Sequence, residues 1–502
     1  MSTLDADLRR AAAAMSGKEA LIAGERRMTY AQLDAAASAL AARLRALGVE
    51  RGDRVAVLLP NGVEAAVAIY GTLRAGAAFV PLNPTIKADK LAYVLNDCAA
   101  VAVVTDDALA PLAEEARAQA PSVQAVVHAH GDVDPEIGAP PPPPISVDLA
   151  AIVYTSGSTG RPKGVTLTHA NMTFAAGAIV DYLGMRAHDR VLCVIPLSFD
   201  YGLYQLLMCV RTGATLVLER GFAFPGRVME LLAEEEITGL PGVPTIFQVL
   251  ASAGAHGVAH DLPELRFITN TAAALAPATI RALCDAFPQA RLYSMYGLTE
   301  CKRVSWLPPE QLEVRPESVG IPIPGTEAWI EDDAGARLPA GEVGELVVRG
   351  AHVMQGYWND AEATAQRLRP GRWPWERELR TGDLFRADGD GFLYFVGRRD
   401  DILKSRGEKV APREVEAVLH AAGGVRTAAV VGAPDRLLGQ AIVAYVVPHG
   451  DAELTAAALL RYCAAHLEDY MVPARIELRD ALPTTPNGKV DRRALAEQAA
   501  AT

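Results

Sequence analysis

The stretch of sequence that points most directly to chemistry runs from Tyr154 to Gly164 and reads Tyr-Thr-Ser-Gly-Ser-Thr-Gly-Arg-Pro-Lys-Gly. The apolar run Leu149–Val153 leads into it and predicts a buried strand that ends where the small residues begin. Glycines let the backbone turn tightly and expose its N–H groups, while hydroxyls and a lysine add donors and positive charge. We expect an anion such as a triphosphate to bind here, on Thr155, Ser156, Gly157, Ser158, Thr159, Gly160 and Lys163.

Two alternatives compete with this interpretation. A flexible Gly/Ser loop without a ligand is common, but a proline and a lysine that close the loop directly after a buried strand favour the anion site. The spacing also differs from the GxxxxGK[ST] pattern of P-loop proteins. The loop therefore predicts a phosphate site of another type.

The loop closely resembles the phosphate loop of the adenylate-forming superfamily, which contains acyl-CoA synthetases, peptide-synthetase adenylation domains and luciferases. The similarity spans nearly the whole chain. Further segments that resemble motifs of the family are Met28–Leu33, Leu73–Leu82, Tyr296–Glu300, Thr381–Asp383, Gly397–Asp400 and Pro486–Lys489. The resemblance implies an ATP-dependent carboxylic acid–CoA ligase that forms AMP: acid and ATP give an acyl-adenylate and pyrophosphate, and coenzyme A then takes the acyl group.

The resemblance also assigns the nucleotide to residues beyond the loop. It implies that adenine stacks on the flat face of Tyr296, and that Gly297 and Thr299 also bind the nucleotide. It implies that Glu300 binds Mg²⁺, and a single carboxylate suits a hard cation that is otherwise held by phosphate oxygens.

The ribose and the reacting groups are assigned to the second half of the chain. Asp383 is expected to accept hydrogen bonds from the ribose diol, and Arg398 to make a second ribose contact. Lys489 is expected to bridge the carboxylate and the α-phosphate, because an anion that attacks another anion needs a placed positive charge. The predicted catalytic residues are thus Lys489, Glu300, Thr155 and Lys163. The resemblance makes Asp400 the hinge about which a small domain rotates between the two half-reactions.

The acyl pocket is predicted beside two segments, Pro196–Gly202 and Asn270–Leu275, and the second lacks the glycines that the family usually has there. The predicted lining residues are Phe199, Asp200, Tyr204, Thr271 and Ala272.

Asp200 leaves two alternatives open, because a carboxylate in an apolar pocket needs a partner. A substrate amine would make the protein an amino- or β-amino-acid adenylating enzyme that loads the phosphopantetheine of a carrier protein. An internal donor, such as Tyr201, Tyr204 or a backbone amide, would leave a plain acid as the substrate.

The elements that must position these residues alternate along the first half of the chain. Short apolar runs, Val55–Leu59 and Ala100–Thr105, predict strands, and Ala/Leu-rich stretches, Tyr30–Leu47 and Gly62–Arg74, predict helices. Such alternation predicts an α/β fold with a parallel sheet.

The pattern changes near Gly397, where a charged cluster is followed by an αββ-like pattern. Together with the pattern, the resemblance implies the adenylate-forming enzyme fold: a large N-terminal α/β domain of residues 1–398 and a small mobile C-terminal α+β domain of residues 399–502.

The composition excludes several other classes of protein. With 48 basic and 60 acidic residues the formal net charge is −12, so a nucleic-acid partner is not expected. The six cysteines form no CxxC pair, and the first ten residues lack the apolar core of a signal peptide.

The sequence predicts a cytoplasmic enzyme without stable membrane insertion, whose partners are a small carboxylic acid and coenzyme A or an acyl carrier protein. Oligomeric state is not predicted. A non-catalytic nucleotide sensor is disfavoured because Lys163, Glu300, Asp383 and Lys489 are all present.

Overall fold

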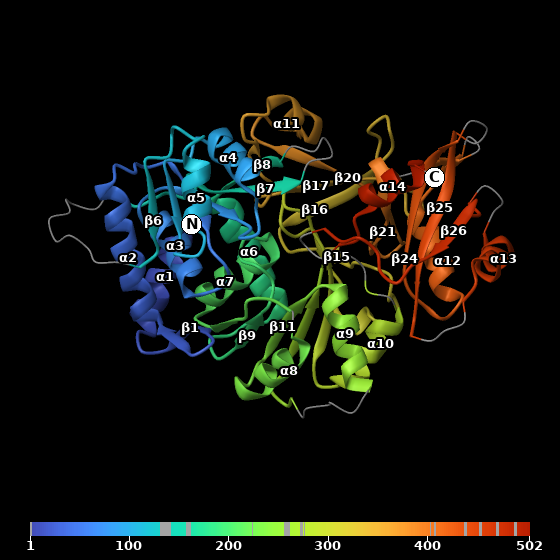
Figure 1. Ribbon diagram of the computed structural model, residues 1–502, viewed down its shortest axis with the longest axis horizontal. Helices are drawn as coiled ribbons and strands as arrows, with labels where there is room; N and C mark the ends of the chain where they lie inside the picture. Colours follow the sequence, from blue (N-terminus) through green and yellow to red (C-terminus); the bar gives the residue numbers. More distant parts are fainter. Residues whose placement is uncertain are drawn as a thin grey trace. The chain divides into compact units, whose positions relative to one another are not determined.

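The computed structural model describes residues 3–130, 142–156, 162–222, 224–255, 262–271, 275, 277–401, 403–405, 408–435, 439–450, 454–467, 471–485 and 489–501. The chain forms two compact units, one of residues 1–328 with 348–380 and one of residues 329–347 with 381–502. The mixed α/β architecture with a large and a small unit confirms the predicted fold class (Figure 1). The predicted domain division at residue 398 stays a prediction.

The first unit contains a nine-stranded sheet in the order β15-β14-β13-β12-β11-β9-β10-β1-β2. Neighbouring strands from β13 through β1 in that order run parallel, whereas β14, β15 and β2 are antiparallel to their neighbours. All four residues are buried in each of β10, β11 and β12, as expected for parallel strands covered on both faces. The strands are β1 (Glu19–Ala23), β2 (Arg26–Thr29), β9 (Arg190–Cys193), β10 (Thr215–Leu218), β11 (Gly239–Gly242), β12 (Phe267–Asn270), β13 (Arg291–Tyr296), β14 (Ser305–Trp306) and β15 (Ile321–Pro322).

A second sheet in the same unit has the order β18-β8-β7-β4-β3-β5-β6. Its strands are β3 (Arg54–Leu58), β4 (Ala78–Leu82), β5 (Ala102–Thr105), β6 (Ala125–His128), β7 (Leu149–Ser156), β8 (Pro162–Thr168) and β18 (Gly356–Tyr357). Strands β3 and β5 overlap the two predicted apolar runs, Val55–Leu59 and Ala100–Thr105. β7 and β8 pair antiparallel, so they form the two arms on either side of the predicted phosphate loop.

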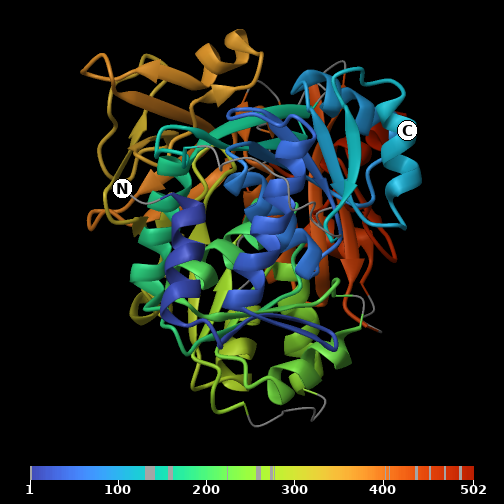
Figure 2. The ribbon, with the colours of Figure 1, turned by 90° about the vertical axis from the view of Figure 1, so that its left-hand side faces the viewer.

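Helices cover these sheets, and several have clear start signals in the sequence. Thr29 begins α2 with a capping box, in which its side chain accepts from Gln32 N–H and the Gln32 side chain accepts from Thr29 N–H. Helices α1, α2 and α3 pack against one another (Figure 2). The helices of this unit are α1 (Leu4–Ala14), α2 (Tyr30–Ala46), α3 (Val63–Arg74), α4 (Ala88–Asp97), α5 (Ala110–Arg117), α6 (His169–Leu183), α7 (Asp200–Thr212), α8 (Pro225–Glu234), α9 (Pro244–Ala255), α10 (Pro277–Ala286), the 3₁₀-helix η1 (Pro309–Gln311) and α11 (Ala361–Arg367).

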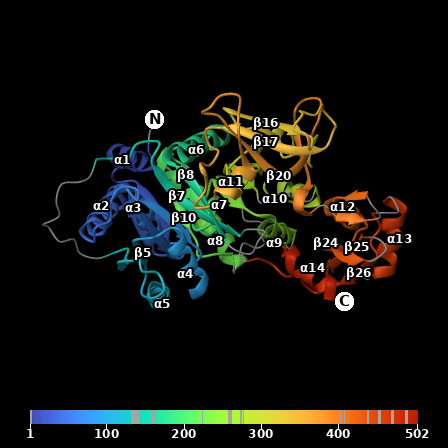
Figure 3. The same ribbon diagram turned by 90° about the horizontal axis from the view of Figure 1, so that it is seen from above.

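The second unit is built around the long antiparallel pair of β24 and β25, with β26 parallel to β25. Side chains alternate along β24: Ala428 and Val430 pack in the cluster that includes α12 and α13, while Ala429 and Val431 pack against α14. The helices therefore lie on opposite faces of the pair (Figure 3). The elements are β22 (Leu403–Ser405), β23 (Glu408–Val410), α12 (Pro412–Ala421), β24 (Val425–Asp435), β25 (Gly439–Pro448), α13 (Ala456–His466), β26 (Arg475–Leu478) and α14 (Arg492–Ala501).

One further group of strands carries the predicted ribose residues. Strand β20 pairs antiparallel with β19 near its start and with β21 near its end. The elements are β16 (Thr326–Glu331), β17 (Gly344–Gly350), β19 (Leu368–Pro370), β20 (Arg377–Ala387), β21 (Leu393–Arg398) and the 3₁₀-helix η2 (Arg399–Asp401).

Candidate functional site

Three predicted site segments follow parallel strands of the nine-stranded sheet. Phe199 and Asp200 come after β9, Thr271 directly follows β12, and Tyr296 is the last residue of β13. The carboxyl ends of parallel strands meet at one edge of a sheet, where ligands of open α/β folds bind. The fold therefore brings together residues that are almost a hundred positions apart in the sequence.

Strands β7 and β8 hold the two ends of the predicted phosphate loop. Thr155 and Lys163 are register partners, and the Thr155 hydroxyl donates to the Lys163 carbonyl oxygen at 3.5 Å. Ser156 is the last residue of β7. Gly157, Ser158, Thr159 and Gly160 lie outside the described residues.

Lys163 and Glu300 are connected by a tyrosine that the sequence did not single out. The Tyr357 hydroxyl donates to Glu300 Oε1 at 2.6 Å. Lys163 Nζ lies 5.4 Å from the centre of the Tyr357 ring and 3.9 Å from Asp360 Oδ2. Burial and the neighbouring Glu300 carboxylate raise the pKa of Tyr357, so its hydroxyl stays a proton donor. Tyr357 thus fixes one oxygen of Glu300 while its ring lies beside the lysine.

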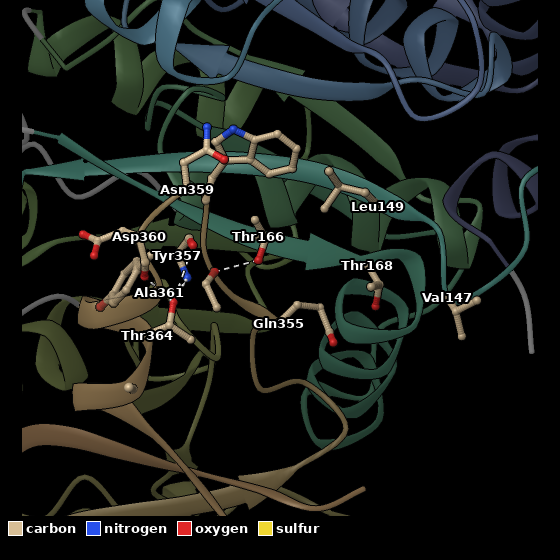
Figure 4. A pocket seen from close by; sticks show the side chains of 13 residues that line it. Val147, Leu149, Thr166, Thr168, Gln355, Tyr357, Asn359, Asp360, Ala361 and Thr364 are labelled. Carbon is tan, nitrogen blue, oxygen red and sulfur yellow. Dashed lines mark hydrogen bonds between the residues drawn. The ribbon is translucent and has the colours of Figure 1, made fainter.

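Tyr357 and Asp360 also line a cavity of about 830 Å³. Its other walls include Thr166 of β8, Gln355, which precedes β18, and Thr364 of α11 (Figure 4). The Thr166 hydroxyl donates to the Gly356 carbonyl oxygen at 2.6 Å and so ties β8 to β18. The cavity and the Lys163–Glu300 cluster therefore share two side chains.

Glu300 suits a Mg²⁺ site in which the protein supplies few ligands. It is half-buried, and the contact with Tyr357 involves only one of its two carboxylate oxygens. Mg²⁺ in nucleotide sites is usually held by one or two carboxylates together with phosphates of the substrate. Among the described residues no group of three or more His, Cys, Asp or Glu side chains is arranged to hold a metal ion. The donor set thus suits an ion that arrives with a phosphate ligand.

The chain turns back sharply after Tyr296 and places Lys302 in an unusual conformation. Val304 N–H donates to the Tyr296 carbonyl oxygen at 2.9 Å. A Cβ atom at Gly297 would lie 2.1 Å from the Lys302 carbonyl oxygen, so only glycine fits there. Lys302 has a positive φ of 61°, a backbone conformation that costs a residue other than glycine about 1–3 kcal/mol. Strain of this kind is concentrated at functional sites.

Lys302 is the partner of Asp200. Lys302 Nζ lies 3.5 Å from Asp200 Oδ2, and the two side chains are 4% and 14% exposed. Burial lowers the pKa of Lys302 to about 8, and the Asp200 charge acts in the opposite direction. The sequence left an internal donor open as one alternative, and this partner is internal, although Lys302 was not among the examples given. Because Asp200 already has a cationic partner, its presence no longer argues for an amine on the substrate.

Arg303, the next residue, lies beside two residues of the predicted acyl pocket, Thr271 and Tyr204. Its side chain is among the largest fully buried ones, with 1% exposure. Its Nη1 donates to the Thr271 hydroxyl at 2.8 Å, and its guanidinium lies 5.7 Å from the centre of the Tyr201 ring. Tyr204, Lys302 and Arg303 line a narrow cavity of about 10 Å³.

For the two remaining predicted pocket residues, Phe199 and Ala272, the structure gives less information. Phe199 is the residue that precedes the first turn of α7, and it is half-buried. Ala272 lies outside the described residues.

In the second unit, the two predicted ribose residues lie opposite each other on neighbouring strands. Asp383 and Arg398 are register partners on β20 and β21, and Arg398 Nε lies 3.2 Å from Asp383 Oδ1. Gly382 has a positive φ of 72° and donates its N–H to Glu345 Oε1 at 3.0 Å. The glycine therefore permits a left-handed backbone conformation within β20, directly before Asp383.

Lys489 and Asp400 also belong to the second unit. Thr485 N–H donates to the Lys489 carbonyl oxygen at 2.7 Å, and Lys489 N–H donates to the Thr485 hydroxyl at 3.3 Å. Both bonds join Thr485 to Lys489, and Lys489 is exposed. Pro486, Asn487 and Gly488 lie outside the described residues, as does the side chain of Asp400, whose backbone forms part of η2.

Arg399, next to Asp400, is held within the second unit. It pairs with Glu345 Oε2 at 3.0 Å and with Asp333 Oδ1 at 2.8 Å. The chain is therefore anchored immediately before the predicted hinge residue.

Comparison with known families identifies the class to which this fold and this site belong. Residues 8–358 match the family of AMP-binding enzymes, and residues 414–489 match the AMP-binding enzyme C-terminal domain. The chain belongs to the AMP-binding enzyme family, which confirms the resemblance predicted from the sequence.

Several individual proteins are similar to this chain over most of its length. A feruloyl-CoA synthase of Amycolatopsis sp. is 35% identical over 472 residues, which cover 92% of this chain and 92% of that protein. A probable non-canonical nonribosomal peptide synthetase of Salinispora arenicola is 36% identical over 94% of this chain, but the match covers 6% of that protein. Among solved structures, the o-succinylbenzoate CoA synthetase of Bacillus subtilis in complex with its acyl-adenylate intermediate has a TM-score of 0.86, with 30% identity and 97% of each chain covered.

The length and apolar character of the helices decide whether any of them could span a membrane. In the part of the chain that the structure describes, none of them combines the length and the apolar character needed to cross a bilayer.

Proposed function

We propose that this enzyme activates a carboxylic acid as its acyl-adenylate and transfers the acyl group to the thiol of coenzyme A. The observation that carries the proposal is the contact of Lys163, Tyr357 and Glu300 at the base of the phosphate loop. A lysine and a magnesium-type carboxylate on either side of one tyrosine suit a triphosphate that must be bound and neutralised. The feruloyl-CoA synthase and the o-succinylbenzoate CoA synthetase, which match nearly the whole chain, support it.

The reaction has two balanced steps. In the first, a carboxylate oxygen of the acid bonds to the α-phosphorus of ATP, and the bond from that phosphorus to the bridging oxygen of pyrophosphate breaks. In the second, the sulfur of coenzyme A attacks the acyl carbon, its thiol proton is lost, and AMP departs with the oxygen that came from the acid. No side chain of the protein forms a covalent intermediate, since the adenylate is itself the activated group.

The residues of the chain bind and orient the reactants. Lys163 offsets phosphate charge, and Tyr357 fixes the orientation of Glu300, which would hold Mg²⁺ together with phosphate oxygens. When bound, Mg²⁺ neutralises charge on the triphosphate. Asp383 and Arg398 are proposed to bind ribose, and Tyr296 to bind the base. Gly297 and Thr299 are proposed as further nucleotide contacts, and Lys489 is proposed to offset the charge of the attacking carboxylate.

Coenzyme A is proposed as the acceptor in preference to a carrier protein. Both offer the same phosphopantetheine thiol, and a probable nonribosomal peptide synthetase matches this chain too. The amino-acid alternative depended on Asp200, and the ion pair with Lys302 accounts for that carboxylate without a substrate amine. The predicted cytoplasmic location remains a prediction.

The test is an acid panel assayed for pyrophosphate release with MgATP, repeated with coenzyme A and scored for thioester. We expect acid-dependent pyrophosphate release, and AMP and thioester in equal amounts when coenzyme A is present. Glu300→Gln, which keeps the size of the side chain, should raise the Mg²⁺ concentration needed for half-maximal rate. Release of ADP and phosphate in place of AMP and pyrophosphate would contradict the proposal.

A further inference from the structure

Arg303 is a buried cation whose described partners are all neutral. Its side chain is 1% exposed, and Nη1 donates to the Thr271 hydroxyl at 2.8 Å. Its other polar neighbours are tyrosines, Tyr201 and Tyr182, whose pKa values burial raises, that of Tyr182 to about 12. No carboxylate among the described residues lies within ion-pair distance of Arg303, and its Nε–H has no hydrogen-bond acceptor there. Arginine stays protonated in proteins, so the free-energy cost of burying this charge cannot be avoided by loss of a proton.

The neighbouring ion pair does not neutralise this charge. Asp200 lies 3.5 Å from Lys302 Nζ, so it is matched by one cation. With Lys302 and Arg303 against one carboxylate, the cluster has one formal positive charge in excess. An uncompensated buried charge is among the most costly features of a protein interior, and such features persist at sites where a ligand completes them.

The position of the cluster indicates what completes it. Lys302 and Arg303 line the narrow cavity with Tyr204, which was predicted from the sequence to line the acyl pocket. Thr271, another predicted pocket residue, accepts the hydrogen bond from Arg303. The cavity of about 10 Å³ is just large enough for one water-sized group, so it could admit a single oxygen at the end of a ligand and not its body.

We propose that Lys302 and Arg303 form an anion-recognition site at the end of the acyl pocket, and that the substrate is a carboxylic acid that carries a second carboxylate. The inference rests on the proposed function and specifies its substrate class. Arginine suits this role because its planar guanidinium can donate several hydrogen bonds to a carboxylate.

Two other substrate classes fit the cluster poorly. A long alkyl acid would cover Arg303 with apolar groups and leave its charge without a partner. A distal ammonium group would meet two cations and a single carboxylate that is already paired. The expected order is therefore dicarboxylate, then the neutral acid, then the amino acid.

The test uses two series of acids that differ only in the group at the far end. One series is glutarate, pentanoate and 4-aminobutyrate, and the other is terephthalate, 4-methylbenzoate and 4-(aminomethyl)benzoate. The measured quantity is kcat/KM for acid-dependent pyrophosphate release by the full-length enzyme. In at least one series the dicarboxylate should exceed its methyl analogue by about 10- to 100-fold, the range expected for hydrogen bonds to a charged group.

Variants at Arg303 separate recognition from folding. Arg303→Met removes the charge at similar volume and should abolish the preference for the dicarboxylate, whereas Arg303→Lys should retain part of it. If Arg303→Met does not fold, as judged by thermal unfolding, Arg303→Gln takes its place. A lowered Tm with an unchanged ranking of acids would show a structural role and overturn the inference.

The outcomes also distinguish this inference from the proposed function. If the wild type prefers the methyl or ammonium analogue in both series, the enzyme is a ligase but the second-carboxylate assignment is wrong. If pyrophosphate is released with neither these nor other acids of a broad panel, the proposed function itself fails.

Discussion

Two residues that sequence patterns did not reveal, Lys302 and Arg303, change the interpretation of the acyl pocket. They directly follow Glu300 and Cys301 in a predicted nucleotide motif, where charged side chains are usually assumed to be solvated. The structure buries both. The available signal was their position between the apolar residues Cys301 and Val304, in a segment that joins two strands of the sheet. A charge in such a segment is a candidate for burial.

The ion pair of Asp200 and Lys302 is expected to be energetically coupled. Lys302→Met should lower the free energy of unfolding by about 3–5 kcal/mol, because it leaves a partly buried carboxylate without its partner. The double variant Asp200→Asn/Lys302→Met should lose less than the sum of the two single variants, with a coupling of at least about 1 kcal/mol. Denaturant unfolding of the four proteins measures this. Simple additivity would show that the two groups do not interact.

Lys489→Ala should separate the two half-reactions. We expect acyl-adenylate formation to fall by at least about 10²-fold, the loss typical of removing one preorganised charge-stabilising donor. Thioester formation from supplied acyl-AMP and coenzyme A should remain. Arg493→Ala is a suitable control, since Arg493 is an exposed residue nearby that pairs with Glu497 on the same helix. Pyrophosphate release at a near-normal rate by the lysine variant would disprove its assigned role.

At the scale of elements, the sequence predicted the pieces that carry regular patterns. The runs that became β3 and β5 are continuously apolar, those that became α2 and α3 are rich in Ala and Leu, and several family motifs, such as Tyr154–Gly164 and Tyr296–Glu300, begin where a strand ends. Contacts between distant elements could not be predicted in this way. Tyr357 donates a hydrogen bond to Glu300, which lies 57 positions away in the sequence, and the local sequence around neither residue indicates this contact. Side chains that meet only through the tertiary fold have no periodic signature.

The turn after β13 offers a test of how an element positions the site. Gly297→Ala would place a methyl group 2.1 Å from the Lys302 carbonyl oxygen, so the turn must shift. We expect a destabilisation of about 1–3 kcal/mol and a loss of acid-dependent pyrophosphate release, since the same turn places Tyr296, Glu300 and Lys302. Gly226→Ala in α8 is the matched control, because nothing lies within 4 Å of a Cβ there and alanine favours a helix. If the two variants have equal stability and equal rates of pyrophosphate release, the turn accommodates the added methyl group and the expectation is wrong.

At the scale of the whole molecule, the predicted hinge links the two steps. Asp400→Pro fixes φ at that residue and should restrict rotation about it. We expect acyl-adenylate formation to be largely retained and transfer to coenzyme A to be lost. Pyrophosphate release and thioester formation, assayed separately on protein of unchanged Tm, measure the two effects. If both half-reactions fall equally, Asp400 does not act as a hinge.

The central claim is that the acid becomes an acyl-adenylate before it becomes a thioester. The most direct test supplies the best acid of the panel with both carboxylate oxygens labelled with ¹⁸O, together with MgATP, coenzyme A and the full-length enzyme. Mass spectrometry of the nucleotide product then shows where the label goes. We predict AMP that carries one labelled oxygen, because the oxygen of the acid that attacks the α-phosphorus leaves with AMP. Unlabelled AMP, or label in inorganic phosphate released with ADP, would contradict this claim.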